Sequence, residues 1–94
     1  MSAYWVAHVN IKNKEKFTEY MNLAFKIVDK YHGKILVCGG TSESLEGHQF
    51  QQHVIIEFEN LHAARTCYFS QDYQQAKTVR ENAAEVMVNL LESL

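Results

Sequence analysis

The stretch that decides the fold is Gly33–Gly47, which reads GKILVCGGTSESLEG. Its apolar segment Lys34–Cys38 predicts a short strand, and Gly39 and Gly40 permit a turn or bulge that a β-carbon would disfavour. Thr41–Glu46 is then expected to continue as a short edge strand. We interpret the stretch as the central hairpin of a longer unit, because helical periodicity precedes it and a strand, a helical segment and another strand follow it.

A long amphipathic helix is predicted before this hairpin. Asn13 is a favourable N-cap residue. Gly33 is expected to end the helix by taking the left-handed conformation that glycine adopts at low cost. Between them, apolar residues recur at helical spacing: Phe17, Tyr20, Met21, Ala24, Ile27, Val28 and Tyr31.

Three further segments, Tyr4–Ile11, Gln52–Glu59 and Glu85–Leu91, alternate as strands do. Asn60 and Ser70 are predicted to cap helical segments between the second and the third. The order βαββαβ with right-handed crossovers predicts an α+β, ferredoxin-like fold with an antiparallel sheet and its helices on one face. Residues 1–94 are expected to form a single domain, because 94 residues are too few for two independent cores.

The two faces of the predicted sheet differ in composition. The helices are expected to cover the apolar face, which carries Trp5, Val9, Val54, Ile56, Phe58, Val86 and Val88. The opposite face carries Tyr4, Val6, His8, His53, Ile55, Glu57, Met87 and Asn89. That second face is too apolar to be left to water, and the sheet of a second copy would cover it, so a homodimer is predicted.

Composition limits the partners. The formal net charge of −2 provides no basic field for a phosphate backbone, so nucleic acid is not expected as a partner. No apolar run approaches the ~20 residues that span a bilayer, so no membrane partner is expected. Met1–Tyr4 leads directly into a patterned segment and leaves no room for a signal peptide, which favours a cytoplasmic location. Cys38 and Cys67 are interpreted as two buried free thiols.

Several segments resemble a known family when they are taken in order: YWV at 4–6, NKEKFTEY at 13–20, YHGKILVCGG at 31–40, SLEG at 44–47, IIEF at 55–58 and SQDYQQAKTVR at 70–80. Together they resemble the domain-of-unknown-function family numbered 1330, in the dimeric α/β-barrel superfamily. The resemblance implies a ferredoxin-like protomer and a dimer whose two sheets enclose a barrel. The chain departs from the family pattern in having no proline, and in having Cys38 where a basic residue is common.

The first candidate site consists of His8, His53 and Glu57 on the face expected to be enclosed by the dimer. Imidazole and carboxylate groups in a partly dry cavity could act as acid and base. Alternatively, the three groups only satisfy one another in the dimer interior. A metal site is not expected, because His53 and Glu57 lie about 13 Å apart along one strand and two ligands make a poor site.

The second candidate set is Arg80, Tyr73 and Glu46, chosen partly because they match the family's motifs. Arg80 could hold a substrate carboxylate, with Tyr20 or Tyr73 supplying a hydroxyl. Alternatively, Arg80 forms an ion pair with Glu46 or Glu57 that ties a helix to the sheet. No cofactor is expected, because Gly39 and Gly40 are not followed by the residues of a phosphate-binding loop.

The resulting functional hypothesis is a homodimer that binds a small organic molecule in a pocket between sheet and helices, with acid/base or cofactor-free oxidative chemistry. Superfamily relatives include cofactor-independent monooxygenases, isomerases, haem enzymes and stress-response proteins, so the fold does not select a reaction. The alternative is a non-catalytic structural or stress-related ligand-binding homodimer. An open pocket with unpaired polar groups would favour the first hypothesis, and a closed, satisfied interior would favour the second.

Overall fold

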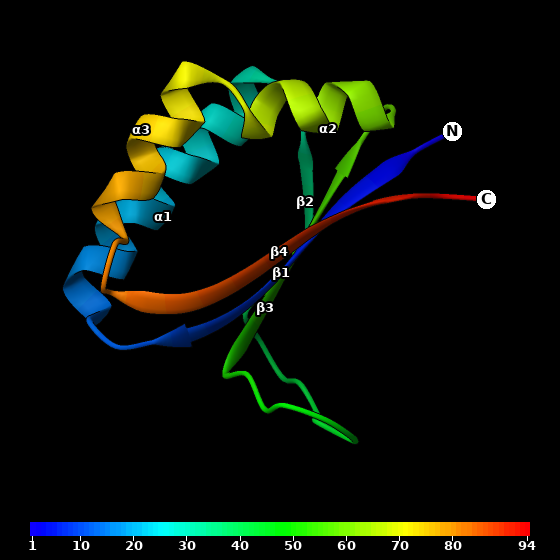
Figure 1. Ribbon diagram of the computed structural model, residues 1–94. Coiled ribbons are helices and arrows are strands. Elements are labelled where there is room, and N and C mark those ends of the chain that lie inside the picture. The colour runs from blue at the N-terminus through cyan, green and yellow to red at the C-terminus, as the bar shows by residue number, and fades with distance from the viewer.

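The computed structural model describes all residues, Met1–Leu94, and has the predicted βαββαβ order. The three helices lie on one side of a single twisted sheet (Figure 1). The strands pair antiparallel in the order β2-β3-β1-β4, so β2 and β4 are the edge strands. The elements are β1 (Ala3–Ile11), α1 (Lys14–Lys30), β2 (Lys34–Cys38), β3 (Gln52–Phe58), α2 (Leu61–Tyr68), α3 (Gln71–Val79) and β4 (Ala84–Glu92).

The helices begin at the predicted capping residues. The side chains of Asn13, Asn60 and Ser70 each accept a hydrogen bond from the backbone N–H three residues later, at 3.1, 2.8 and 3.1 Å. Each cap thereby satisfies one of the backbone donors that a helix start leaves without a partner. None of the helices combines the length and the apolar character needed to cross a bilayer.

The core lies between the sheet and the helices, as predicted. Trp5 is at its centre, with ring centroids 4.8 Å from Tyr73, 5.3 Å from Tyr68 and 6.4 Å from Phe58. The predicted helix-facing residues of β1 and β3 are buried. Val86 and Val88 pack against this core but are only half-buried, because β4 is an edge strand.

The end of α1 differs from the prediction. The left-handed residue is His32, with φ of 63°, and not Gly33. Position 33 requires a glycine because there is no room for a side chain. A β-carbon there would lie 2.7 Å from Val28 Cγ1 and 2.8 Å from Phe58 Cζ. The chain therefore enters β2 in close contact with the core, at a position that no larger residue fits without displacing Val28 or Phe58.

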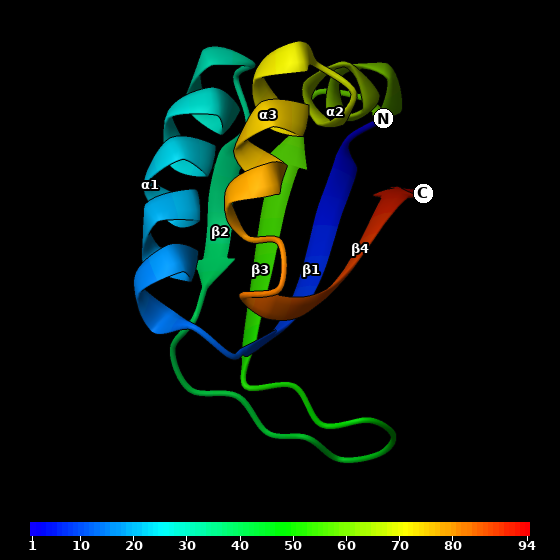
Figure 2. The ribbon, with the colours of Figure 1, turned by 60° about the vertical axis from the view of Figure 1, so that its left-hand side comes forward.

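The segment Thr41–Glu46 is not the predicted edge strand but part of a long loop between β2 and β3, which extends beyond the end of the sheet (Figure 2). Gly39 and Gly40 are both left-handed, with φ of 70° and 78°, and turn the chain away from the ladder after the Gly39 N–H donates to the His53 carbonyl. Cys38 is exposed, contrary to the prediction of two buried thiols, because it lies on an edge strand, whereas Cys67 is buried.

The sheet face turned away from the helices is called the open face here. Its side chains form rows across the central strands, because β1 pairs with both β3 and β4 in register. These rows are Glu57–Tyr4–Leu91, Ile55–Val6–Asn89 and His53–His8–Met87. Tyr4, Val6, His8, His53, Ile55 and Glu57 are half-exposed in the single chain, which agrees with the predicted division of the two faces.

Candidate functional site

The structure brings together two of the three residues proposed as an acid/base group. His8 and His53 are direct cross-strand partners, and their Nδ1 atoms lie 2.8 Å apart. One Nδ1 must therefore donate the hydrogen bond and the other must accept it. Glu57 is not part of this contact, because it lies two rows away and accepts a hydrogen bond from the Tyr4 hydroxyl at 3.4 Å.

A hollow of about 540 Å³ opens beside the two histidines on the open face. Glu46 lies here, in the loop between β2 and β3, together with His48 and Phe50. The predicted grouping of Glu46 with Arg80 and Tyr73 is wrong, since those two residues line other hollows, on the helix side of the sheet. No group of three or more His, Cys, Asp or Glu side chains has an arrangement that could hold a metal ion.

Arg80 makes neither of the two ion pairs that were considered for it. The chain has one ion pair of a Lys or Arg within 4.0 Å, Lys30–Asp72, and one histidine–carboxylate contact, His48–Glu85, and neither involves Arg80. Its buried Nε has no hydrogen-bond partner. Arg80 follows the last residue of α3 as its C-cap and lies on the helix side of the sheet, which separates it from Glu46.

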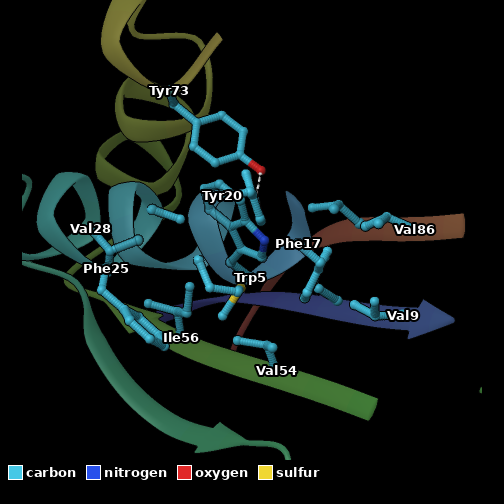
Figure 3. Close-up of a pocket in the computed structure, with 14 residues that line it drawn as sticks. Trp5, Val9, Phe17, Tyr20, Phe25, Val28, Val54, Ile56, Tyr73 and Val86 are labelled. Carbon is cyan, nitrogen blue, oxygen red and sulfur yellow. Dashed lines mark hydrogen bonds between the residues drawn. The ribbon is translucent and has the colours of Figure 1, made fainter. Parts of the chain in front are cut away.

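Arg80 instead lies against the two tyrosines that match the family motif. The Tyr20 hydroxyl on α1 and the Tyr73 hydroxyl on α3 are 2.6 Å apart, and this contact is drawn in Figure 3. The guanidinium carbon of Arg80 lies 5.1 Å from the centroid of the Tyr20 ring. Three residues from two helices thus form one cluster, which we call the Tyr–Tyr–Arg cluster.

The two tyrosines of the Tyr–Tyr–Arg cluster border a cavity between the sheet and the helices, which we call the apolar cavity (Figure 3). Its fourteen lining residues are all hydrophobic, and they include Trp5, Tyr20, Tyr73, Val86 and Val88. Its volume of about 30 Å³ is close to that of one water molecule. The predicted pocket between sheet and helices is therefore too small, by itself, for an organic molecule.

A larger hollow of about 290 Å³ lies between the end of α3 and β4, and we call it the α3–β4 hollow. It shares Val86 and Val88 with the apolar cavity, so the two spaces adjoin. Arg80, Lys77 and Tyr68 supply its polar groups, together with Thr78 and Glu81. Lys77 and Tyr68 are not among the residues predicted for a site from the sequence. The spacing of three residues between Lys77 and Arg80 was the available signal, because it places both on one side of a helix.

The ionisation of the buried groups limits the chemistry of the site. Burial, and after it the phenol of Tyr20, raises the pKa of Tyr73 well above its usual value. Burial also raises the pKa of Cys67 to about 11. Near neutral pH the cluster therefore presents the protonated phenol of Tyr73 and a guanidinium, which donate hydrogen bonds, and the buried thiol of Cys67 is a poor nucleophile.

Similar solved structures share this fold at low sequence identity. The RPA0582 protein of unknown function from Rhodopseudomonas palustris is 17% identical, with a TM-score of 0.79 over 99% of this chain and 82% of that chain. A dimeric ferredoxin-like protein of unknown function from Jannaschia sp. CCS1 is 12% identical, with a TM-score of 0.72 over 99% of this chain and 100% of that chain.

A third structure, SnoaB, is a cofactor-independent oxygenase from Streptomyces nogalater. It is 9% identical, with a TM-score of 0.66 over 99% of this chain and 93% of that chain. Identities this low show a common fold and nothing further. A comparison with curated proteins finds no match. The family model described as "Domain of unknown function (DUF1330)" matches residues 2–94, and the chain therefore belongs to this family.

Proposed function

We propose that this protein binds a small organic molecule on the helix side of its sheet, at the Tyr–Tyr–Arg cluster and the adjoining α3–β4 hollow. The observation that carries the proposal is the buried Nε of Arg80, which has no partner although it lies beside two phenols. A buried donor without a partner is costly, and a ligand oxygen would satisfy it. The volume of about 290 Å³ is near the lower end of the range for ligand pockets.

The open face is assigned a different role, the contact with a second copy of the chain. Its polar side chains already satisfy one another, as His8 with His53 and Tyr4 with Glu57. Its apolar residues are insufficiently covered in the single chain, with Met87 49% and Leu91 53% exposed. A second sheet packed on this face would bury both, and the Jannaschia protein of the same fold is described as dimeric.

Any chemistry at the site would rest on hydrogen-bond donation. The Tyr73 hydroxyl and the Arg80 guanidinium would polarise a ligand oxygen and stabilise negative charge that develops on it. SnoaB is described as a cofactor-independent oxygenase, and a bound carbanion stabilised in this way is the kind of species that cofactor-free oxidation requires. Binding is the primary proposal, and turnover is its extension.

The alternative is a structural homodimer with no ligand, and the paired groups of the open face favour it. An amide-resolved NMR titration with three probes of one size, namely benzoate, benzamide and benzylamine, separates the two functions. Ligand binding predicts shift changes at the amides of Tyr20, Tyr73 and Arg80 with at least one probe. Changes confined to the loop between β2 and β3, or none with any probe at millimolar concentration, would contradict the proposal.

The dimer is tested separately by light scattering coupled to gel filtration. Ile55→Lys places a charge in the central row of the open face, and it is expected to give a monomer. Leu23→Lys is the matched control, because Leu23 is an apolar residue of α1, 39% exposed, on the helix side of the molecule. A dimer in Ile55→Lys, or a monomer in the unmodified protein, would refute the open-face interface.

A further inference from the structure

The cations around the α3–β4 hollow pack over aromatic rings and make no ion pair. Arg65, Lys77 and Arg80 lie over the rings of Phe69, Tyr68 and Tyr20, at 5.2, 5.2 and 5.1 Å from the ring centroids. No Asp or Glu oxygen is within 4.0 Å of any of the three. Of the nine Lys and Arg side chains only Lys30 makes an ion pair, so what distinguishes Lys77 and Arg80 is that they line one hollow together and that the buried Nε of Arg80 has no partner.

Lys30 is the one lysine or arginine with a carboxylate partner. It also lies near an aromatic ring, 5.7 Å from the centroid of Tyr31, but its Nζ is paired with Asp72 at 2.6 Å. Glu81 lines the α3–β4 hollow with Lys77 and Arg80, yet it pairs with neither. The hollow therefore keeps two cations available, one of them with a buried donor that has no partner.

The surroundings of these cations are apolar on one side. Val86 and Val88 of β4 form a wall that the α3–β4 hollow shares with the apolar cavity. Tyr68 adds an aromatic surface and a hydroxyl that accepts from Lys77 Nζ at 3.3 Å. A second hollow of about 310 Å³ adjoins through Tyr68 and Val88 and includes Arg65. An anionic group bound here would have hydrocarbon surface next to it.

From this arrangement we infer that the ligand is an apolar monocarboxylate, whose carboxylate is held by Arg80 and Lys77 and whose hydrocarbon part packs on Tyr68, Val86 and Val88. This inference rests on the proposed function and specifies its ligand class. A guanidinium and an ammonium can both donate to one carboxylate, and the apolar wall excludes water from one side of it. A cationic ligand would face two like charges, and a neutral one would leave them unpaired.

The test compares three probes of matched size by NMR titration. Benzoate is expected to bind about tenfold more tightly than benzamide, and benzylamine more weakly than either. Lys77→Gln is expected to weaken benzoate binding about fivefold, as for a partly exposed charge pair, and to leave benzamide unchanged. Lys26→Gln is the matched control, because it removes the same charge from an exposed site on α1 and should not affect benzoate.

Each outcome is decisive. Benzoate and benzamide binding equally at Tyr20, Tyr73 and Arg80, with no effect of Lys77→Gln, would overturn the carboxylate inference and leave the proposed function standing. Binding of none of the three probes would overturn both. A preference for benzylamine would also overturn the inference, because the site would then select a cation. Lys77→Gln is chosen over a substitution of Arg80 because Arg80 has a buried side-chain nitrogen and lies against the ring of the buried Tyr20, so its loss could unfold the protein.

Discussion

The hydroxyls of Tyr20 and Tyr73 lie 2.6 Å apart, although the two residues are 53 positions apart in the chain. Both tyrosines are buried, and α1 and α3 are neighbours on the same face of the sheet (Figure 2). The contact satisfies two polar groups in an otherwise apolar core, and it fixes the position of α3 and thereby of Arg80 directly after it. It therefore serves both the stability of the fold and the geometry of the proposed site.

The first prediction concerns this pair of hydroxyls. Tyr20→Phe or Tyr73→Phe alone should lower the free energy of unfolding by ~1–3 kcal/mol, because each leaves a buried hydroxyl without its partner. The double variant should cost no more than one of the single variants, since both polar groups are then removed. Urea denaturation of the four proteins measures this coupling. Additive losses in the double variant would contradict a shared hydrogen bond.

The second prediction concerns the junction between α1 and β2. Gly33→Ala should destabilise the protein by ~1–3 kcal/mol, because its β-carbon would press on Val28 and Phe58. His32→Gly should be neutral or stabilising by up to ~1 kcal/mol, because His32 has a left-handed backbone. Thermal denaturation of the two variants checks both signs. A destabilising His32→Gly would contradict the left-handed backbone of His32, and a neutral Gly33→Ala would mean that Val28 and Phe58 leave room for a β-carbon.

Local features of the fold were predicted correctly from the sequence, and features that depend on distant residues were not. Asn13, Asn60 and Ser70 were identified correctly because an N-cap is a local signal, which depends on residues within one turn. The role of Gly33 was not identified, because the reason for a glycine there is Phe58, which follows 25 positions later and reaches it only in the folded sheet. The predicted strand Thr41–Glu46 failed because two left-handed glycines redirect the chain.

The sequence predicted which residues belong to the candidate sites better than it predicted which of them lie together. Tyr20, Tyr73 and Arg80 do come together, and His8 does meet His53, because strand alternation and helix spacing place residues on faces. Glu46 was placed with the wrong group, since a loop residue has no periodicity to assign it to a face. Lys77 was overlooked because a lysine near a helix C-terminus is common, and only the adjoining Val86 and Val88 give it significance.

The third prediction concerns the two thiols. Cys38 is exposed and Cys67 is buried, so a disulfide reagent such as DTNB should modify one thiol rapidly in the folded protein and the second only after denaturation. Cys38→Ser should abolish the rapid reaction with the reagent and leave only the thiol that reacts after denaturation. Two fast thiols would show that α2, which carries Cys67, opens readily.

The fourth prediction concerns alkaline pH. Burial raises the pKa of Cys67 from 9.0 to about 11, so the folded state favours the protonated thiol. This contribution to stability is fully present below pH 9 and is lost as pH rises through 11, because the unfolded chain loses the proton first. Its upper limit is ~2.7 kcal/mol, from two pKa units at ~1.36 kcal/mol each.

Other groups titrate in the same pH range, above all Tyr73, whose raised pKa changes the stability with the same sign. A variant without the Cys67 thiol separates the contribution of Cys67 from theirs. The free energy of unfolding of the unmodified protein and of Cys67→Ala is measured in urea from pH 7 to pH 11. The difference between the two should be constant up to about pH 9 and should then shrink, because only the unmodified protein has a thiol to ionise. A difference that stays constant to pH 11 would mean that the Cys67 thiol ionises alike in the folded and unfolded chains, and that the core around α2 is more hydrated than its burial implies.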